Sequence, residues 1–164
     1  MSYSDRKLLQ VNPGDITPNI VVAQNGSGKY DSIIKAVAEV PKKNIQQFII
    51  YVKAGVYNER FDIHKHVNYV MIYGDGTTKT VITNNVSVAF VIPKLTTFHT
   101  RTFTSSGLNF IAKDIGFENT AEAEGHQAVA LRASDDIIAF YNYHFNGYQD
   151  TIYSHSCDNS IVIA

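Results

Sequence analysis

Apolar and polar positions along this chain fall into short runs separated by turns. From residue 47 onward, runs rich in β-branched and aromatic residues alternate with turns rich in Gly, Asn, Asp and Thr. Such runs are typical of strands. The strands we expect cover residues 20–23, 48–52, 69–73, 80–83, 110–117, 128–133, 137–145 and 161–163. The pattern therefore predicts an all-β architecture.

One segment has helical spacing instead. Apolar residues recur every three or four positions at Ile33, Ile34, Val37 and Val40. Pro41 follows directly and cannot continue a helix, so we predict one short helix over residues 32–40. Before it, residues 11–19 contain two prolines and a glycine, and we expect an extended linker there. The helix would cap the N-terminal end of a stack of strands, where edge and apolar surface would otherwise be exposed.

The spacing of apolar anchors bears on how the strands are arranged. Ile115, Ile137 and Ile161 recur at nearly equal intervals, each slightly longer than the ~20 residues at which solenoid repeats begin. This loose repeat supports stacked coils of a parallel β-helix, but a β-sandwich fits the strands nearly as well. In a β-helix, Asn119, Asn142 and Asn146 could lie at coil corners, because Asn tolerates left-handed backbone geometry.

Composition and charge restrict the classes of partner. The chain has 164 residues, of which 45% are hydrophobic and 18% charged, as in ordinary globular proteins. Its net charge of −1 gives no electrostatic reason to bind nucleic acid or anionic membranes. No apolar run approaches the ~18 residues of a membrane span. We therefore expect neither a nucleic-acid nor a membrane partner. The one cysteine, Cys157, excludes an intramolecular disulfide framework.

Two glutamines and one carboxylate carry the candidate chemistry. Gln127 lies in GHQAVALR at 125–132, and Gln149 and Asp150 lie in NGYQDTIY at 146–153. An amide N–H can stabilise a developing oxyanion, and a neighbouring carboxylate can give or accept a proton during acyl transfer. The separation of the two glutamines is close to the ~20 residues of a short solenoid repeat, so it suits one coil. One coil would bring both amides to neighbouring positions on one sheet face.

These motifs, with others in the same order, resemble the plant pectin methylesterases, a family of aspartyl carboxylesterases. The resemblance is carried by PNIVVA at 18–23 with GSG at 26–28, YVKAGVY at 51–57 with Glu59, GDG at 74–76 with TKT at 78–80, QAVALR at 127–132, and GYQDTIY at 147–153. It implies a right-handed parallel β-helix with one short N-terminal capping helix. It also implies a pectinesterase-type hydrolase that removes methyl esters from cell-wall homogalacturonan.

The resemblance assigns roles to individual residues. It implies that Asp150 is the acid/base and that Gln127 and Gln149 stabilise the tetrahedral oxyanion. Tyr153 and Phe98 are the expected substrate-binding residues of the pectin cleft. Each also has a structural interpretation, as a turn residue, a corner hydrogen-bonder or a packing aromatic. The family chemistry requires no metal and no organic cofactor.

Two family signatures are not found in this sequence. The nucleophilic aspartate of an Asp-Phe-Ile-Phe-Gly signature and the arginine of a Leu-Gly-Arg-Pro-Trp signature are both missing, and the chain has no Trp. We therefore expect a C-terminally truncated member whose esterase activity is low. The alternative is a non-catalytic pectin-binding or partner-binding protein on the same scaffold. Partners other than pectin would be a proteinaceous inhibitor, or a second copy through an open C-terminal coil.

The N-terminal segment suggests a secreted origin. Residues 1–10 have no apolar core of a signal peptide, but Arg6-Lys7-Leu8-Leu9 resembles the processing site that follows a family pro-region. We therefore divide the chain into a leader over residues 1–17 and an incomplete β-helix domain over residues 18–164. The resemblance implies secretion to the plant cell wall or apoplast.

Other groups of polar residues give weaker indications of a functional site. His64 and His66 could both face one side of a strand, but no Cys or carboxylate stands at metal-site spacing, so we expect two surface histidines. Asp135-Asp136 is interpreted as a solvated corner. The segment GSGK at 26–29 lacks the remaining residues of a phosphate loop and is interpreted as a turn.

Overall fold

The computed structural model describes residues 10–84, 103–120, 131–133, 137–146, 152–154 and 160–163. A 3-10 helix η1 covers Pro13–Asp15, and helix α2 covers Ile33–Ala38. The strands of the first half are β1 Ile20–Val22, β2 Phe48–Val52, β3 Gly55–Asn58, β4 Phe61–Ile63, β5 Val70–Gly74 and β6 Thr80–Asn84. Those of the second half are β7 Phe103–Ser105, β8 Phe110–Asn119, β9 Leu131–Ala133, β10 Ile137–Asn146, β11 Ile152–Ser154 and β12 Ser160–Ile163.

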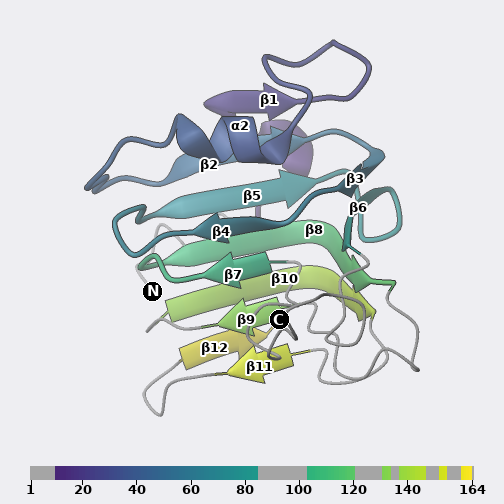
Figure 1. The fold of residues 1–164 in the computed structure, drawn as a ribbon. Coiled ribbons are helices and arrows are strands. Elements are labelled where there is room, and N and C mark those ends of the chain that lie inside the picture. The colour runs from purple at the N-terminus through teal and green to yellow at the C-terminus, as the bar shows by residue number, and fades with distance from the viewer. Residues whose placement is uncertain are drawn as a thin grey trace, which may run out of the picture.

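The strands stack into three parallel faces (Figure 1). The first face has the order β1-β2-β5-β8-β10-β12. The second is made by β3 and β6 with the later halves of β8 and β10, and the third has the order β4-β7-β9-β11. Every pairing between described strands is parallel. Parallel neighbours joined by a full turn of chain define a parallel β-helix and exclude the β-sandwich, whose strands are antiparallel.

The long strands β8 and β10 each turn from the first face to the second at one left-handed residue. Asp114 in β8 has φ 55° and Asn142 in β10 has φ 45°. The two lie on adjacent coils, and the Asn142 amide donates a hydrogen bond to the Asp114 carboxylate. The corner position expected for Asn142 is confirmed. Asn119 and Asn146 end β8 and β10 and so lie at the next corner.

Coil lengths vary widely on the first face. The Cα partners are Phe48 with Val70, Met71 with Ile111, Phe110 with Ile138, and Ile138 with Ile161. The number of residues from one partner to the next is smallest for Phe48–Val70 and Ile138–Ile161. It is nearly twice as large for Met71–Ile111. The stacked strands keep one register, whereas the segments between them differ in length. This explains why no strict repeat is visible in the sequence.

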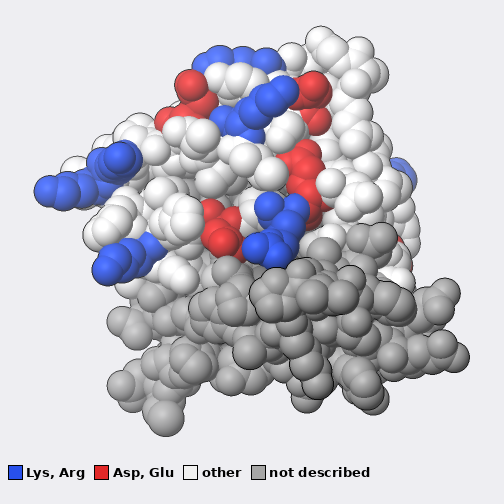
Figure 2. All heavy atoms as spheres, in the orientation of Figure 1, with Lys and Arg blue, Asp and Glu red and all other residues white. Residues whose placement is uncertain are grey.

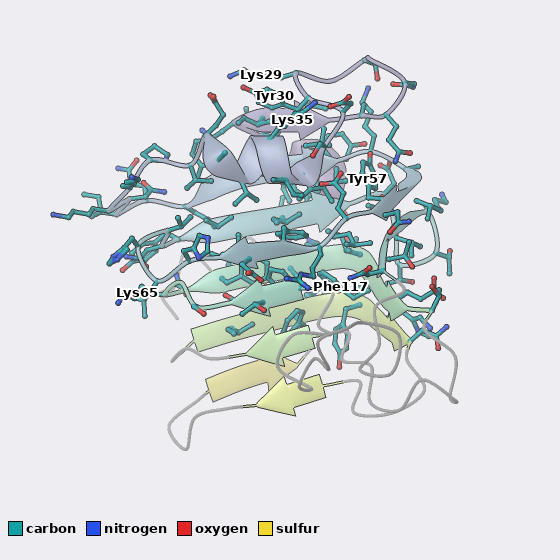
Figure 3. The ribbon with its side chains drawn as sticks, viewed as in Figure 1. Lys29, Tyr30, Lys35, Tyr57, Lys65 and Phe117 are labelled. Carbon is teal, nitrogen blue, oxygen red and sulfur yellow. The ribbon has the colours of Figure 1, made fainter. Side chains whose placement is uncertain are left out.

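Aromatic rings fill the interior between the faces. Phe103 is fully buried and its ring lies 4.9 Å from Phe61, 4.9 Å from Phe110 and 5.4 Å from Phe117. The Phe117 ring is in turn edge-on to Phe140 at 6.3 Å (Figure 3). Each such pair adds about 0.5–1.5 kcal/mol beyond the area it buries. The rings come from all three faces and so tie the coils together.

Helix α2 covers the N-terminal end of this interior, as the sequence predicts (Figure 1). It packs against β1, β2 and β4, and its residues Ile33 and Ala36 are fully buried. The observed helix starts at Ile33 and ends at Ala38, slightly inside the predicted range of 32–40. The cap covers the apolar face of the first described coil.

The segment before β1 packs on the outer surface of the first face. Ile16 joins a second apolar cluster with Met71, Tyr73, Ile111 and Ala139. The Lys113 ammonium donates a hydrogen bond to the carbonyl of Val11 and lies 5.2 Å from the Tyr141 ring. Burial lowers the pKa of Lys113. The expectation of a wholly extended linker is wrong at Pro13–Asp15, where the chain forms a 3-10 turn that lets Ile16 reach the sheet.

The helices of the described residues are short. Helix α2 has six residues, and no helix in this part of the chain has the length and apolarity to cross a membrane.

Candidate active site

Along β4, the first strand of the third face β4-β7-β9-β11, residues alternate between the core and the opposite side of the sheet, whereas all three residues of β7 are buried. Phe61 and Ile63 of β4 are buried in the core, so Asp62 between them points away from it. Register then places Asp62, Thr104, Arg132 and Tyr153 in one column across the four strands, which we call the Asp62 column. Tyr153, an expected substrate-binding residue, therefore occupies the last position of this column on β11.

The candidate catalytic residues come immediately before two neighbouring strands of this face. Gln127 precedes the start of β9 by four residues, and Gln149 and Asp150 precede β11 by three and two. Strands β9 and β11 are parallel neighbours with Ile152 opposite Leu131. Both motif segments thus enter the same face on consecutive coils. The side chains of Gln127, Gln149, Asp150 and Phe98 lie outside the described residues.

The sequence separation of the two glutamines agrees with the length of this coil. On the third face, one coil runs from Leu131 to its partner Ile152. The separation of Gln127 and Gln149 exceeds that of the paired residues by a single position. Adjacent strands lie about 4.8 Å apart.

Hydrogen bonds tie consecutive coils together at the corner from which both motif segments depart. Thr120 N–H donates to the carbonyl of Asn84 at 2.8 Å, and the Asn146 amide donates to Glu118 Oε1 at 3.0 Å. Glu118 and Asn146 are direct register partners on β8 and β10. Sequence reasoning missed Glu118, Thr120 and Asn84, and only the coil spacing could have indicated them.

A pocket of about 420 Å³ opens beside the same face, between α2 and β4. Its apolar lining includes Ile34, Val37, Ala38, Val40, Phe61 and Val67. Lys42, Arg60, Asp62 and His64 provide its charged and polar groups. Figure 2 shows acidic and basic side chains interspersed over α2 and the coil beneath it. No single sequence motif contains these residues, so this pocket was also missed.

Residues of the YVKAGVY motif at 51–57 form a structural corner with Asp75 on another side of the molecule. Asp75 accepts hydrogen bonds from Tyr51 Oη at 2.6 Å and from Ala54 N–H at 2.7 Å. Burial, together with the hydrogen bond to Asp75, raises the pKa of Tyr51 to about 12. Tyr57, labelled in Figure 3, donates to the carbonyl of Lys53 at 2.9 Å. These residues hold the turns between β2, β3 and β5 in place and bring no reactive group to the third face.

The described residues show no metal-ligand constellation. Within the described ranges, no three His, Cys, Asp or Glu side chains gather closely enough to hold an ion. His64 and His66 are both exposed, as expected for surface histidines.

Comparison with known proteins identifies the architecture and its motifs. The family model described as pectinesterase matches residues 19–159. This range includes both glutamine segments, the YVKAGVY motif with Glu59, the GDG motif at 74–76, and all strands from β1 to β11.

Individual proteins agree with the family match. The chain is 51% identical over 148 residues to a probable pectinesterase/pectinesterase inhibitor of Arabidopsis thaliana, covering 90% of this chain and 26% of that protein. A solved pectin methylesterase from carrot superposes with a TM-score of 0.85 at 42% identity, over 90% of this chain and 45% of that one. A pectin methylesterase in complex with a hexasaccharide superposes with a TM-score of 0.78 at 29% identity, over 85% and 46%. The chain therefore spans about a quarter of that curated relative and less than half of these solved enzymes.

Proposed function

Because the chain belongs to the pectinesterase family, we propose that it contributes to hydrolysis of the methyl esters of pectin. The observation that carries this proposal is the parallel pairing of β9 with β11. That pairing joins the two motif segments that the resemblance assigns to oxyanion stabilisation and proton transfer. The solved enzymes with the same fold are pectin methylesterases, and one of them was determined with a bound hexasaccharide.

The proposed chemistry divides between two parts of the site. Gln127 and Gln149 donate amide hydrogen bonds to the oxyanion of the tetrahedral intermediate. Asp150 protonates the departing methanol and then activates the water that releases the acid. The family's nucleophilic aspartate, in its own signature, does not occur in residues 1–164. This chain therefore supplies the oxyanion donors and the acid/base, and the covalent step requires a carboxylate from outside these motifs.

We assign a substrate contact to Tyr153, which follows Asp150 in the same motif and which register places in the Asp62 column. A tyrosine ring there offers a flat surface for a sugar ring. We include Phe98 as the second aromatic of the cleft on the resemblance alone.

The cellular setting follows from the same relatives. The curated relative is a plant protein, and its name joins pectinesterase with pectinesterase inhibitor. We propose that this chain acts in the plant cell wall on methylated homogalacturonan, and that an inhibitor protein is a second partner. The leader over residues 1–17 would then connect a pro-region to the β-helix domain.

The alternative is a pectin-binding protein without esterase activity on the same scaffold. Such a protein would bind methylated oligogalacturonides without releasing methanol.

A chimera separates the two functions. It joins residues 19–159 to the remaining coils of the carrot enzyme, and methanol release from methylated pectin is measured. We expect hydrolysis, lowered by about 10²–10⁴-fold in Asp150→Asn and by about 10²–10³-fold in Gln127→Ala or Gln149→Ala. Asp31→Asn, an equal change at an exposed residue next to α2, should leave the rate unchanged. A folded chimera that binds pectin and releases no methanol would support the binding protein.

A further inference from the structure

We propose that the pocket between α2 and β4 binds the free carboxylate of a non-esterified galacturonate unit in the same pectin chain. This inference rests on the proposed function, since it assumes that pectin lies on the third face. It adds a recognition site for de-esterified sugar at the helix-capped end of the solenoid.

The charges of the pocket fit an anionic sugar. Lys42 and Arg60 carry positive charge, whereas Asp62 is the one carboxylate among the described lining residues. Lys42, Arg60 and His64 are all exposed residues of the pocket lining. An arginine fork can bind a carboxylate through two parallel hydrogen bonds, which a neutral methyl ester cannot match. The pocket should therefore prefer the acid to its ester.

The floor of the pocket fits the remainder of the sugar. Val37, Val40 and Val67 are at least partly buried beneath the rim, and Ile34 keeps 48% of its surface exposed. Pyranose rings present C–H groups on their faces and can cover such apolar surface. A volume of about 420 Å³ is within the range of small-ligand sites. Positive groups around an apolar floor suit one uronate unit better than a simple inorganic anion.

The pocket and the candidate active site share the third face. Arg60, Asp62 and His64 alternate along β4 and its flanks, and Asp62 starts the column that ends at Tyr153. From β4 to β9 is two strand spacings and to β11 is three, or about 10–14 Å. One sugar of an extended galacturonan advances by a length similar to one strand spacing. A chain lying along the solenoid axis would place its free acid two or three units from the reacting ester.

The experiment uses binding rather than hydrolysis, so that it is independent of the proposed chemistry. A non-esterified hexagalacturonate and its fully methylated form are titrated into the full chain, with affinity measured by calorimetry and the site by amide chemical shifts. The acid should bind more tightly than the ester and shift amides of α2 and β4. Lys42→Gln and Arg60→Gln should each lower affinity for the acid about two- to fivefold and leave affinity for the ester unchanged.

A matched control removes the same charge elsewhere. Lys79→Gln, at an exposed turn next to β6, should change neither affinity. Arg60 directly precedes a core strand, so circular dichroism must show that its variant folds, while Lys42 lies in an exposed loop and gives an independent result.

Several results would overturn the proposal. The first is equal affinity for the acid and the ester. The second is a loss of affinity in Lys79→Gln as large as that in Lys42→Gln or Arg60→Gln. The third is no binding at millimolar sugar. Equally tight, equally Lys42-dependent binding of a polyglutamate peptide would also overturn it, because the pocket would then be a general acidic-peptide site. If the proposed ester hydrolysis fails while these differences hold, only the proposed function is wrong.

Discussion

The carboxylate of Glu59 accepts a hydrogen bond from Ser32 Oγ at 2.9 Å, across 27 residues of sequence. The same carboxylate accepts from Ile33 N–H at 3.2 Å and Ile34 N–H at 3.0 Å. Ser32 is the N-cap of α2, yet its own side chain makes no capping hydrogen bond. The helix that closes the solenoid is therefore capped by a residue of a later segment, and a signature residue of the family has a structural role.

Removal of Glu59 should destabilise the capped end. In Glu59→Ala the first N–H groups of α2 lose their acceptor and a favourable charge at the helix N-terminus, which costs about 1–2 kcal/mol. Urea unfolding measures this difference. The control Glu39→Ala removes an exposed carboxylate that pairs with Lys29 at 3.0 Å, and it should lower the free energy of unfolding much less, because exposed ion pairs contribute little. Equal losses in both variants would argue against the cap.

Tyr51 should make stability depend on pH in the alkaline range. Its pKa is about 12 in the folded protein and about 10 when unfolded, so the folded state holds the proton more tightly. The resulting stabilisation is complete below pH 10 and is lost as pH rises from 10 to 12. The free energy of unfolding of the parent should therefore approach that of Tyr51→Phe across this range. A constant difference between them from pH 8 to 12 would refute the assignment.

The segment before β1 should contribute to stability. Ile16 is 7% exposed and packs on the outer surface of the first face, so Ile16→Ala should lower the free energy of unfolding by about 2–4 kcal/mol. Ile45 is 83% exposed, and Ile45→Ala provides the matched control with little expected change. If both variants unfold at the same denaturant concentration, the segment does not stabilise the sheet.

Most long elements could be predicted because their local pattern agrees with their final environment. The predicted 48–52 strand matches β2 because it is a continuous run of β-branched and aromatic residues. The predicted helix contains α2 because its apolar residues recur at helical spacing. Strands β3, β4, β7 and β11 were not separately identified. They have only three or four residues, too few for a periodic signal, and their pairing partners lie a whole coil away.

The candidate site likewise has a part that could be predicted from the sequence and a part that could not. Gln127, Gln149 and Asp150 could be proposed from contiguous motifs, whose coil spacing agrees with the β9–β11 register. The pocket at Lys42 and Arg60 could not be, because its residues come from a loop, a helix and a strand flank. Their proximity depends on how α2 packs over β4, which no local pattern encodes.

The central claim is that stacking of β9 on β11 brings Gln127 and Gln149 into one site. A double substitution, Gln127→Cys with Gln149→Cys in a Cys157→Ser background, tests it directly by mass spectrometry after mild oxidation. Adjacent strands at about 4.8 Å fall within the Cα separation of about 4.4–6.8 Å that a disulfide bridges. The account predicts a reducible cross-link within the monomer, absent when Gln127→Cys is paired with Asn25→Cys at the far end. A folded monomer that forms no cross-link between positions 127 and 149 would contradict it.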